Sequence, residues 1–210
     1  MGYENRVTRI ESTYLIVMNF KKAVGWSHHL VSEILGPGDN AIDATAGNGH
    51  DTLFLLNHVG ETGRVYSFDI QQEAIDSTHE RLTDSRLNFN GVTLINSSHA
   101  EMDRHIPKEC LGSVKVIMFN FGYLPGGDHS ITTKGETSRQ AVTQALGLLQ
   151  IGGRMVLTFY TGHPGGEEEA QQVTELLETL DPKKFVVLIY KFINLPNKPP
   201  YVIAVERVER

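Results

Sequence analysis

Residues 43–52, DATAGNGHDT, join an apolar segment to a segment of helical composition. Gly47 and Gly49 let the backbone turn sharply and approach a ligand closely, as in the loop after the first strand of nucleotide-binding α/β folds. Asp69 ends the next predicted strand, twenty residues beyond Gly49, where a carboxylate can accept both ribose hydroxyls of an adenosine. Together, the loop and the carboxylate predict a ligand that contains adenosine.

The same stretch distinguishes between two such cofactors, NAD and S-adenosylmethionine. A dinucleotide loop favours a third glycine, because the helix start then carries the pyrophosphate, but Thr52 stands at that position. Asp43 would repel a pyrophosphate, whereas its carboxylate suits a cationic sulfonium and ammonium. The stretch thus resembles motif I of the class I methyltransferases, with Thr45 in place of the first glycine, and favours S-adenosylmethionine. An NAD-linked dehydrogenase and a purely structural turn are the alternatives.

Strands and helices alternate along the chain, which predicts a largely parallel sheet. Strands are expected over 41–45, 64–70, 92–96, 114–121 and 154–160, and helices over 51–59, 71–87, 138–149 and 167–180. Gly152 and Gly153 are interpreted as the stop of the third helix. Two final strands, 185–192 and 201–208, have no helix between them and predict an antiparallel hairpin at one edge. The expected fold is Rossmann-like α/β, a mostly parallel seven-stranded sheet with helices on both faces, as in class I methyltransferases.

Length and composition limit the remaining possibilities. With 210 residues and a net charge of −6, the chain is expected to form one S-adenosylmethionine-dependent methyltransferase domain over 1–210, residues 1–20 being an extension without an assigned role. One cysteine excludes an internal disulfide, and the nine histidines lack metal-site spacing, so no metal is expected. No apolar run reaches the ~18 residues of a membrane-spanning helix, so the protein is expected in the cytoplasm, without a membrane partner.

The predicted cofactor residues lie at or just after the carboxyl ends of the first three strands. Asn48, His50 and Asp51 are expected near the methionine end of the cofactor, and Gln71 near the ribose or adenine. His99 is expected at the adenine edge, with a capped helix start as its alternative. The full predicted set is Asn48, Gly49, His50, Asp51, Asp69, Gln71, Ser98 and His99.

Residues 120–128, NFGYLPGGD, follow the fourth strand and are expected in the crevice beside the cofactor's methyl group. The carbonyl oxygen of Asn120 and a backbone carbonyl can hold the two hydrogens of an acceptor amine. The ring of Tyr123 can stack on a base or pack against a cation. Asn120 and Tyr123 are therefore the predicted catalytic residues. The predicted substrate-binding residues are Gly122, Leu124, Pro125 and Gly126.

This chemistry predicts transfer of a methyl group to nitrogen. An amine with a pKa of about 10 must first lose a proton, and Tyr123, Asp128 and His129 are the candidates for the base. A ring nitrogen is an alternative acceptor. A glycine-rich turn with Tyr123 packed inward is the alternative without catalysis.

Five segments together resemble the putative rRNA methylase family of class I methyltransferases, whose characterised bacterial members are the MnmM group: 43–55, 68–71, 119–133, 160–168 and 194–206. The resemblance covers nearly the whole chain from about Ser27, and the stretch FNFGYLPGGD at 119–128 is specific to this family. It implies that S-adenosylmethionine binds at the predicted cofactor residues other than Gly49. It also implies methylation of the amine of 5-aminomethyl-2-thiouridine at the tRNA wobble position, with residues 120–126 at the acceptor and the tRNA anticodon arm as partner.

The acidic balance does not favour RNA binding through bulk charge, so phosphate contacts would require local basic residues. A methyltransferase that acts on rRNA or on a small amine is the alternative function, and a catalytically silent nucleotide-binding module is a further one. The terminal hairpin offers a surface for a homodimer. The candidate basic residues are Lys134, Arg139, Lys183, Lys184, Lys191 and Lys198.

Overall fold

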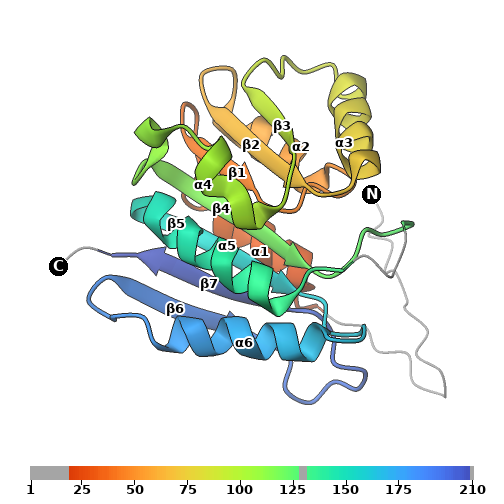
Figure 1. The fold of residues 1–210 in the computed structure, drawn as a ribbon, viewed down its shortest axis with the longest axis vertical. Helices are drawn as coiled ribbons and strands as arrows, with labels where there is room; N and C mark the ends of the chain where they lie inside the picture. Colours follow the sequence, from red (N-terminus) through yellow and green to blue (C-terminus); the bar gives the residue numbers. More distant parts are fainter. Residues whose placement is uncertain (1–18, 128–131, 209–210) are drawn as a thin grey trace.

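The computed structural model describes residues 19–127 and 132–208, which build one seven-stranded sheet flanked by helices (Figure 1). Within these ranges, every helix is too short or too polar to cross a lipid bilayer. The strands are β1 (Asn40–Asp43), β2 (Arg64–Asp69), β3 (Val92–Asn96), β4 (Val114–Phe121), β5 (Leu149–Phe159), β6 (Phe185–Tyr190) and β7 (Tyr201–Arg207). The helices are α1 (Ala23–Ser32), α2 (His50–Val59), α3 (Gln72–Asp84), α4 (Met102–His105), α5 (Gly135–Leu148) and α6 (Gly166–Glu178), with 3-10 turns η1 (His99–Glu101) and η2 (Lys108–Cys110).

The sheet has the order β3-β2-β1-β4-β5-β7-β6. Strands β1 to β5 run parallel, whereas β7 pairs antiparallel with both β5 and β6. The predicted fold class is therefore confirmed, including the antiparallel hairpin at one edge. Most of the predicted extension, residues 1–18, lies outside the described ranges.

Gly152 and Gly153 do not end a helix, and that prediction is wrong. Helix α5 ends at Leu148 and β5 begins with the next residue, so both glycines lie inside the strand. The pairing of β4 with β5 shifts register here, and Gly152 has a φ of +70°. A Cβ on Gly153 would lie 2.9 to 3.0 Å from three backbone oxygens. The two glycines therefore serve a bulge and a close backbone approach within the sheet.

Helices cover the sheet on both faces, with α5 and α6 on one face and α1 and α2 on the other (Figure 1). Central strand β4 shows how the sequence produces this arrangement. Ile117, Phe119 and Phe121 join the buried cluster beneath α5 and α6, whereas Val116 and Met118 join the cluster beneath α1 and α2. Successive side chains point to opposite faces, so the consecutive apolar residues 116–119 serve both layers.

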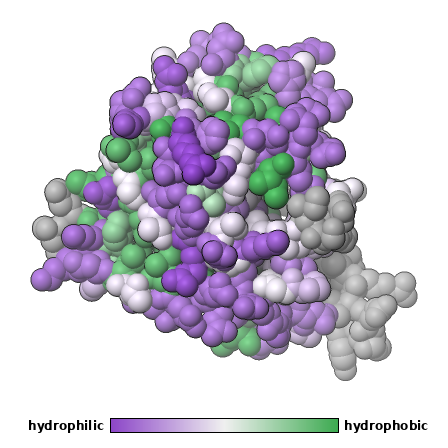
Figure 2. Space-filling model, viewed as in Figure 1, coloured by the Kyte–Doolittle hydropathy of each residue, from purple (hydrophilic) through white to green (hydrophobic). Residues whose placement is uncertain are grey.

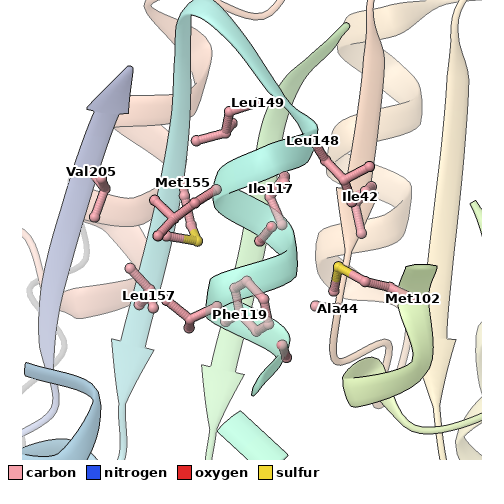
Figure 3. Close-up of a cluster of buried hydrophobic side chains, with 14 of the residues drawn as sticks. Ile42, Ala44, Met102, Ile117, Phe119, Leu148, Leu149, Met155, Leu157 and Val205 are labelled. Atoms are coloured by element: carbon pink, nitrogen blue, oxygen red, sulfur yellow. The ribbon is translucent and has the colours of Figure 1, made fainter. Parts of the chain in front are cut away.

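The cluster beneath α5 and α6 is the larger part of the hydrophobic core. Figure 3 shows Ile117, Phe119, Met155 and Leu157 projecting from the sheet toward α5, with Met102 from α4 beside them. Burial of each such side chain stabilises the fold by roughly 1.5–3 kcal/mol. The outer surface around α6 is mostly hydrophilic (Figure 2), as expected for an amphipathic helix.

Strands β1 and β4 are neighbours, although the chain continues from β1 to β2 on the other side. At such a switch point the loops after the two strands diverge and leave a crevice at their carboxyl ends. The backbone N–H of Asn120 donates to Thr45 Oγ1 at 2.8 Å, which ties the two loops together across 75 residues of sequence. The sheet topology therefore brings motif I and the predicted acceptor loop to one place.

Candidate active site

A cavity of about 810 Å³ lies at the carboxyl ends of the parallel strands. Its wall combines the loop after β1, the end of β2, the start of η1, the loops after β4 and β5, and the segment between β6 and β7. The structure therefore brings the predicted cofactor and acceptor residues into one cavity. The predicted residues that line it are Asn48, His50, Asp51, Asp69, Gln71, Ser98, His99, Asn120, Gly122, Tyr123, Leu124 and Pro125.

Two predicted site residues, Gly49 and Gly126, do not line the cavity. Gly49 has a φ of +75°, and a Cβ there would lie 2.8 Å from the Cα of Thr78. Gly126 has a φ of +84° in the turn that Gly127 closes by donating to the carbonyl of Leu124 at 3.0 Å. Both glycines therefore shape the backbone on either side of the cavity, because other residues rarely adopt these φ angles.

Asp43 is completely buried beneath the motif I loop. Its Oδ1 accepts the backbone N–H of Thr45 at 3.1 Å, and its Oδ2 accepts the hydroxyl of Thr52 at 2.7 Å. Thr52 also shares a hydrogen bond with Ser67 of β2 at 2.7 Å. The expectation that this carboxylate faces the cofactor's positive charge is wrong, because the loop folds over it. Asp43 instead organises the turn, and Asp51 is the acidic residue of this loop that reaches the cavity.

Asp69 lines the cavity at the end of β2 and is held by the backbone. Its Oδ2 accepts the N–H of Gly47 at 3.0 Å, and its Oδ1 accepts the N–H of Gln71 at 2.9 Å. Burial raises the pKa of the Asp69 carboxyl group, and these hydrogen bonds counteract the rise. Each carboxylate oxygen has a second lone pair, so the group can also accept hydrogen bonds from a ligand's hydroxyls.

His99 lies at the other side of the cavity and is almost completely buried. Its Nδ1 lies 3.3 Å from the carbonyl oxygen of Ala44, which only accepts, so Nδ1 carries the proton. Burial lowers the pKa of the imidazole to about 4, so the ring is neutral near pH 7. Its Nε2 is buried and has no hydrogen-bond partner within the described ranges. Ser98 caps the turn η1 by accepting the N–H of Ala100 at 3.2 Å, so the capped start expected as an alternative is also present.

Asn120 and Asp51 meet where the two loops converge. The amide nitrogen of Asn120 donates to Asp51 Oδ2 at 2.7 Å. The other carboxylate oxygen, Oδ1, lies 2.6 Å from Nε2 of His28 on α1. The Asp51 side chain is only 12% exposed and that of His28 is 29% exposed. A line of three polar side chains therefore runs from α1 through the start of α2 to the end of β4.

A buried glutamate anchors the acceptor loop. Gly122 donates its N–H to Thr133 Oγ1 at 2.9 Å, and the Thr133 hydroxyl donates to Glu169 Oε2 at 2.7 Å. Ser138 donates its hydroxyl to Glu169 Oε1 at 2.5 Å. Burial raises the pKa of Glu169, and the two hydroxyl donors counteract it. A Cβ on Gly122 would lie 3.2 Å from Cβ of Tyr160, so the loop and the residue after β5 pack closely.

Tyr123 lines the cavity and is 40% exposed, so the alternative in which it packs inward is wrong. Its ring lies edge-on to the ring of His163, with 5.9 Å between the centroids. Asp128 and His129, the other two candidates for the base, lie outside the described residues. Asn48 bridges the two loops by donating its side-chain amide to the carbonyl of Pro125 at 3.2 Å.

The cavity wall also includes residues that are not among the predicted site residues, such as Tyr160, Thr133 and Asn197. Tyr160 directly follows β5, so the rule that ligands bind at the carboxyl ends of strands points to it. Burial and the nearby Asp51 charge raise the pKa of the Tyr160 phenol. Thr133 and Asn197 lie in loops and do not directly follow a parallel strand, so this rule does not point to them.

The candidate basic residues differ in their position relative to the cavity. Lys134 and Lys198 line the cavity, and Lys198 forms an ion pair with Glu167. β6 runs in the same direction as β5, so its amino-terminal end lies away from the cavity. Lys183 and Lys184 precede β6 at that end. The remaining two do not line the cavity: Arg139 is exposed on α5, and Lys191 lies 4.8 Å from the ring centroid of Tyr201.

The strand order with antiparallel β7, together with a cavity at the switch point between β1 and β4, defines a class I methyltransferase. The chain belongs to the putative rRNA methylase family, whose sequence profile matches residues 65–206. The dehydrogenase alternative is therefore wrong.

Relatives and solved structures agree with this family. The chain is 36% identical over 194 residues to a chloroplastic tRNA (mnm(5)s(2)U34)-methyltransferase of Arabidopsis thaliana, covering 89% of this chain and 70% of the relative. A putative rRNA methylase from Clostridium thermocellum superposes with a TM-score of 0.86 at 45% identity, covering 91% of this chain and all of that one. A putative methyltransferase from Streptococcus mutans, crystallised in complex with SAH, superposes with a TM-score of 0.80 at 33% identity, covering 90% and 99%.

Replacement of Asp43 by asparagine is expected to remove a pH dependence of folding stability. Burial and the neighbouring Asp51 raise the pKa of Asp43 from 3.8 to about 7. Between these values the folded protein keeps a proton that the unfolded chain has released, so stability falls as pH rises, by up to about 1.4 kcal/mol per pH unit. Urea unfolding across this window should show the wild type losing stability relative to Asp43→Asn. A relative gain would mean that the buried anion is the favoured native form.

Proposed function

We propose that this chain is an S-adenosylmethionine-dependent N-methyltransferase that converts the aminomethyl group of 5-aminomethyl-2-thiouridine at the tRNA wobble position to methylaminomethyl. The observation that carries the proposal is the position of Asn120. Its amide stands where the cofactor loop meets the acceptor loop, with its nitrogen bound to Asp51 and its carbonyl oxygen at the other end of the amide. This arrangement suits a nitrogen acceptor, because an amide oxygen accepts a hydrogen bond from an amine.

The residues around the cavity fit S-adenosylmethionine, which supplies an electrophilic methyl group on a sulfonium sulfur. The carboxylate of Asp69 would accept the ribose hydroxyls, with Gln71 beside it. Ser98 and His99, which line the cavity after β3, would lie beside the adenine. Asn48, His50 and Asp51 would surround the methionine end, where Asp51 matches its positive charge.

The acceptor side of the cavity fits an amine carried on a nucleobase. The amine must be neutral, so that its lone pair forms a bond to the methyl carbon while the carbon–sulfur bond breaks and its electron pair stays on sulfur. The nitrogen gains a carbon and keeps its two hydrogens until solvent equilibrates the product. Asn120 would hold one hydrogen of the amine, and Gly122, Leu124, Pro125 and Gly126 would form the wall on which the base rests.

A wobble base must leave the stacked anticodon to enter such a cavity. The ring of Tyr123 is exposed enough for a base to stack on it, which contributes about 1–3 kcal/mol. Lys134 and Lys198 line the same cavity and suit the phosphates of the tRNA anticodon arm. The name of the Arabidopsis relative supports this substrate. We also propose that the protein acts in the cytoplasm, where it would meet tRNA.

Ribosomal RNA is the second candidate substrate. A 72-residue part of the chain is 40% identical to the ribosomal RNA small subunit methyltransferase H of Ruthia magnifica, covering 34% of this chain and 22% of that relative. The acceptor loop favours tRNA, since the aminomethyl group of the modified uridine is an aliphatic amine that reaches beyond the ring. A free small amine lacks the base and phosphates for which Tyr123 and the two lysines are suited.

Incubation of the protein with labelled S-adenosylmethionine and tRNA from cells that lack the final wobble methylation tests the proposal. Mass spectrometry of the digested nucleosides should show one methyl group added to 5-aminomethyl-2-thiouridine. Ribosomal RNA and small amines serve as parallel substrates in the same assay. Transfer to either of these, with none to tRNA, would contradict the proposal.

Two substitutions should separate the cofactor side of the cavity from the acceptor side. Asp69→Ala is expected to weaken S-adenosylmethionine binding at least about tenfold, because hydrogen bonds to a charged group are lost. Asn120→Ala is expected to leave that affinity within about twofold and to lower kcat about 100-fold, because the amine is no longer held. Calorimetric titration and single-turnover assays measure the two effects. Unchanged affinity in Asp69→Ala, or full activity in Asn120→Ala, would contradict the respective role.

We also propose that two copies of the chain associate through β6. This strand ends the sheet, and its sequence FVVLIY carries no charge. Val186, Val187, Leu188 and Ile189 are each between 40% and 52% exposed. An apolar edge strand is usually covered in natural proteins. A second copy fits, because a twofold contact sets apolar side chains against apolar ones, whereas RNA phosphates require cations.

Leu188→Lys should therefore convert a dimer into a monomer, because a twofold axis brings both introduced charges into the same interface. Sedimentation velocity at micromolar concentration measures the change. Thr83→Lys, on the exposed surface of α3, is the matched control and should stay dimeric. A monomeric wild type would contradict the proposed association.

A further inference from the structure

We infer that His28 and Asp51 are positioning residues that hold the amide of Asn120 in one orientation, with its carbonyl oxygen turned to the acceptor nitrogen. The inference deepens the proposed function and rests on it for the identity of the acceptor. The observation behind it is the continuous line from His28 Nε2 to Asp51 and on to Asn120, with contacts of 2.6 and 2.7 Å. The three residues come from α1, α2 and β4, which no local sequence pattern connects.

The orientation of Asn120 follows from the chemistry of its neighbour. An asparagine amide can turn by half a rotation and exchange a donor for an acceptor in nearly the same volume. The carboxylate of Asp51 only accepts, so the end of the amide that faces it must be the nitrogen. The carbonyl oxygen is then the end that is left for a ligand. An amine that donates one hydrogen to this oxygen keeps its lone pair free for the methyl carbon.

To fix the orientation of the Asn120 amide, Asp51 needs a second partner, because a carboxylate held at one oxygen can still rotate. His28 supplies that partner at the other oxygen. The imidazole is itself held flat against the ring of Phe54, with centroids 3.9 Å apart and planes within 5° of parallel. Helix α1 also packs onto β5 and β7, so the histidine stands on a helix anchored to the sheet. Both oxygens of Asp51 thus have fixed donors.

The charge of Asp51 adds a preference for the kind of acceptor. An aliphatic amine arrives mainly as a cation at neutral pH, a nearby carboxylate attracts it, and the ammonium must release one proton to solvent before its lone pair can react. A substituent that ends in a carboxylate would be repelled from the same place. The line of three residues therefore favours an aminomethyl group over a carboxymethyl group, while Asn120 remains the residue that touches the acceptor.

The histidine offers a matched pair of variants for the test. His28→Phe keeps a ring to stack on Phe54 but removes the nitrogen that donates to Asp51. His28→Gln keeps a donor at a similar reach and loses the ring. We expect His28→Phe to lower kcat for tRNA about tenfold while the dissociation constant for SAH stays within about twofold, and His28→Gln to restore most of the rate, because small misplacements of a reacting group are costly.

A second measurement does not depend on catalysis. The side-chain amide of Asn120 gives a pair of nitrogen–proton resonances in ¹⁵N-labelled protein, assigned by their loss in Asn120→Ala. We expect one proton of the pair to be shifted downfield by the carboxylate in the wild type and in His28→Gln, and to move toward free asparagine in His28→Phe. Asp51→Ala should produce the same movement, which keeps the test available if His28→Phe does not fold.

The inference is overturned if His28→Phe and Asp51→Ala leave the amide resonances unchanged. It is also overturned if these variants weaken SAH binding while kcat is kept, since His28 and Asp51 would then serve the cofactor alone. A wild-type protein that methylates no tRNA contradicts the proposed function instead, and the amide resonances still decide the orientation of Asn120.

Discussion

The parallel pairing of β1 with β4 is the constraint on which the rest of the site depends. It places the end of β1, which carries motif I, beside the end of β4, which carries the acceptor loop. Three hydrogen bonds then join the two segments: the Asn120 backbone donates to Thr45, the Asn120 amide donates to Asp51, and Asn48 donates to Pro125. A methyl transfer needs two substrates in contact within about an ångström of the productive geometry, and this junction supplies the rigid frame for it.

Two buried acidic side chains stabilise that frame from the protein interior, and each accepts hydrogen bonds. Asp43 accepts from Thr45 and Thr52 beneath the cofactor loop, and Glu169 accepts from Thr133 and Ser138 behind the acceptor loop. A buried carboxyl group without donors would destabilise the fold by several kcal/mol. The acids that reach the cavity, Asp51 and Asp69, are tied in the same way. Many polar side chains around the cavity therefore form hydrogen bonds that hold the loops in place. Only some of their atoms remain available to bind ligands.

This division explains how an acidic chain can be suited to an RNA substrate. The net charge of the chain is −6, whereas Lys134 and Lys198 line the cavity itself. Lys183 and Lys184 lie at the opposite edge of the sheet and cannot share a phosphate contact with them. Recognition would then rest on stacking and on the fit of one base, with a small number of phosphate contacts.

Local sequence patterns predict the order of elements, the central place of β4 and twelve of the residues that line the cavity. Glycines, a mostly apolar eight-residue strand and residues just past strand ends are local signals, and a parallel sheet brings its strand ends together on one side. Which side chains face the cavity and which lie beneath it depends on tertiary packing. The Asp43 side chain is buried, Gly152 and Gly153 lie within β5, and His28 contacts Asp51, which is 23 residues away in the sequence. These outcomes depend on how separate elements pack, and periodicity along one element carries no information about its neighbours.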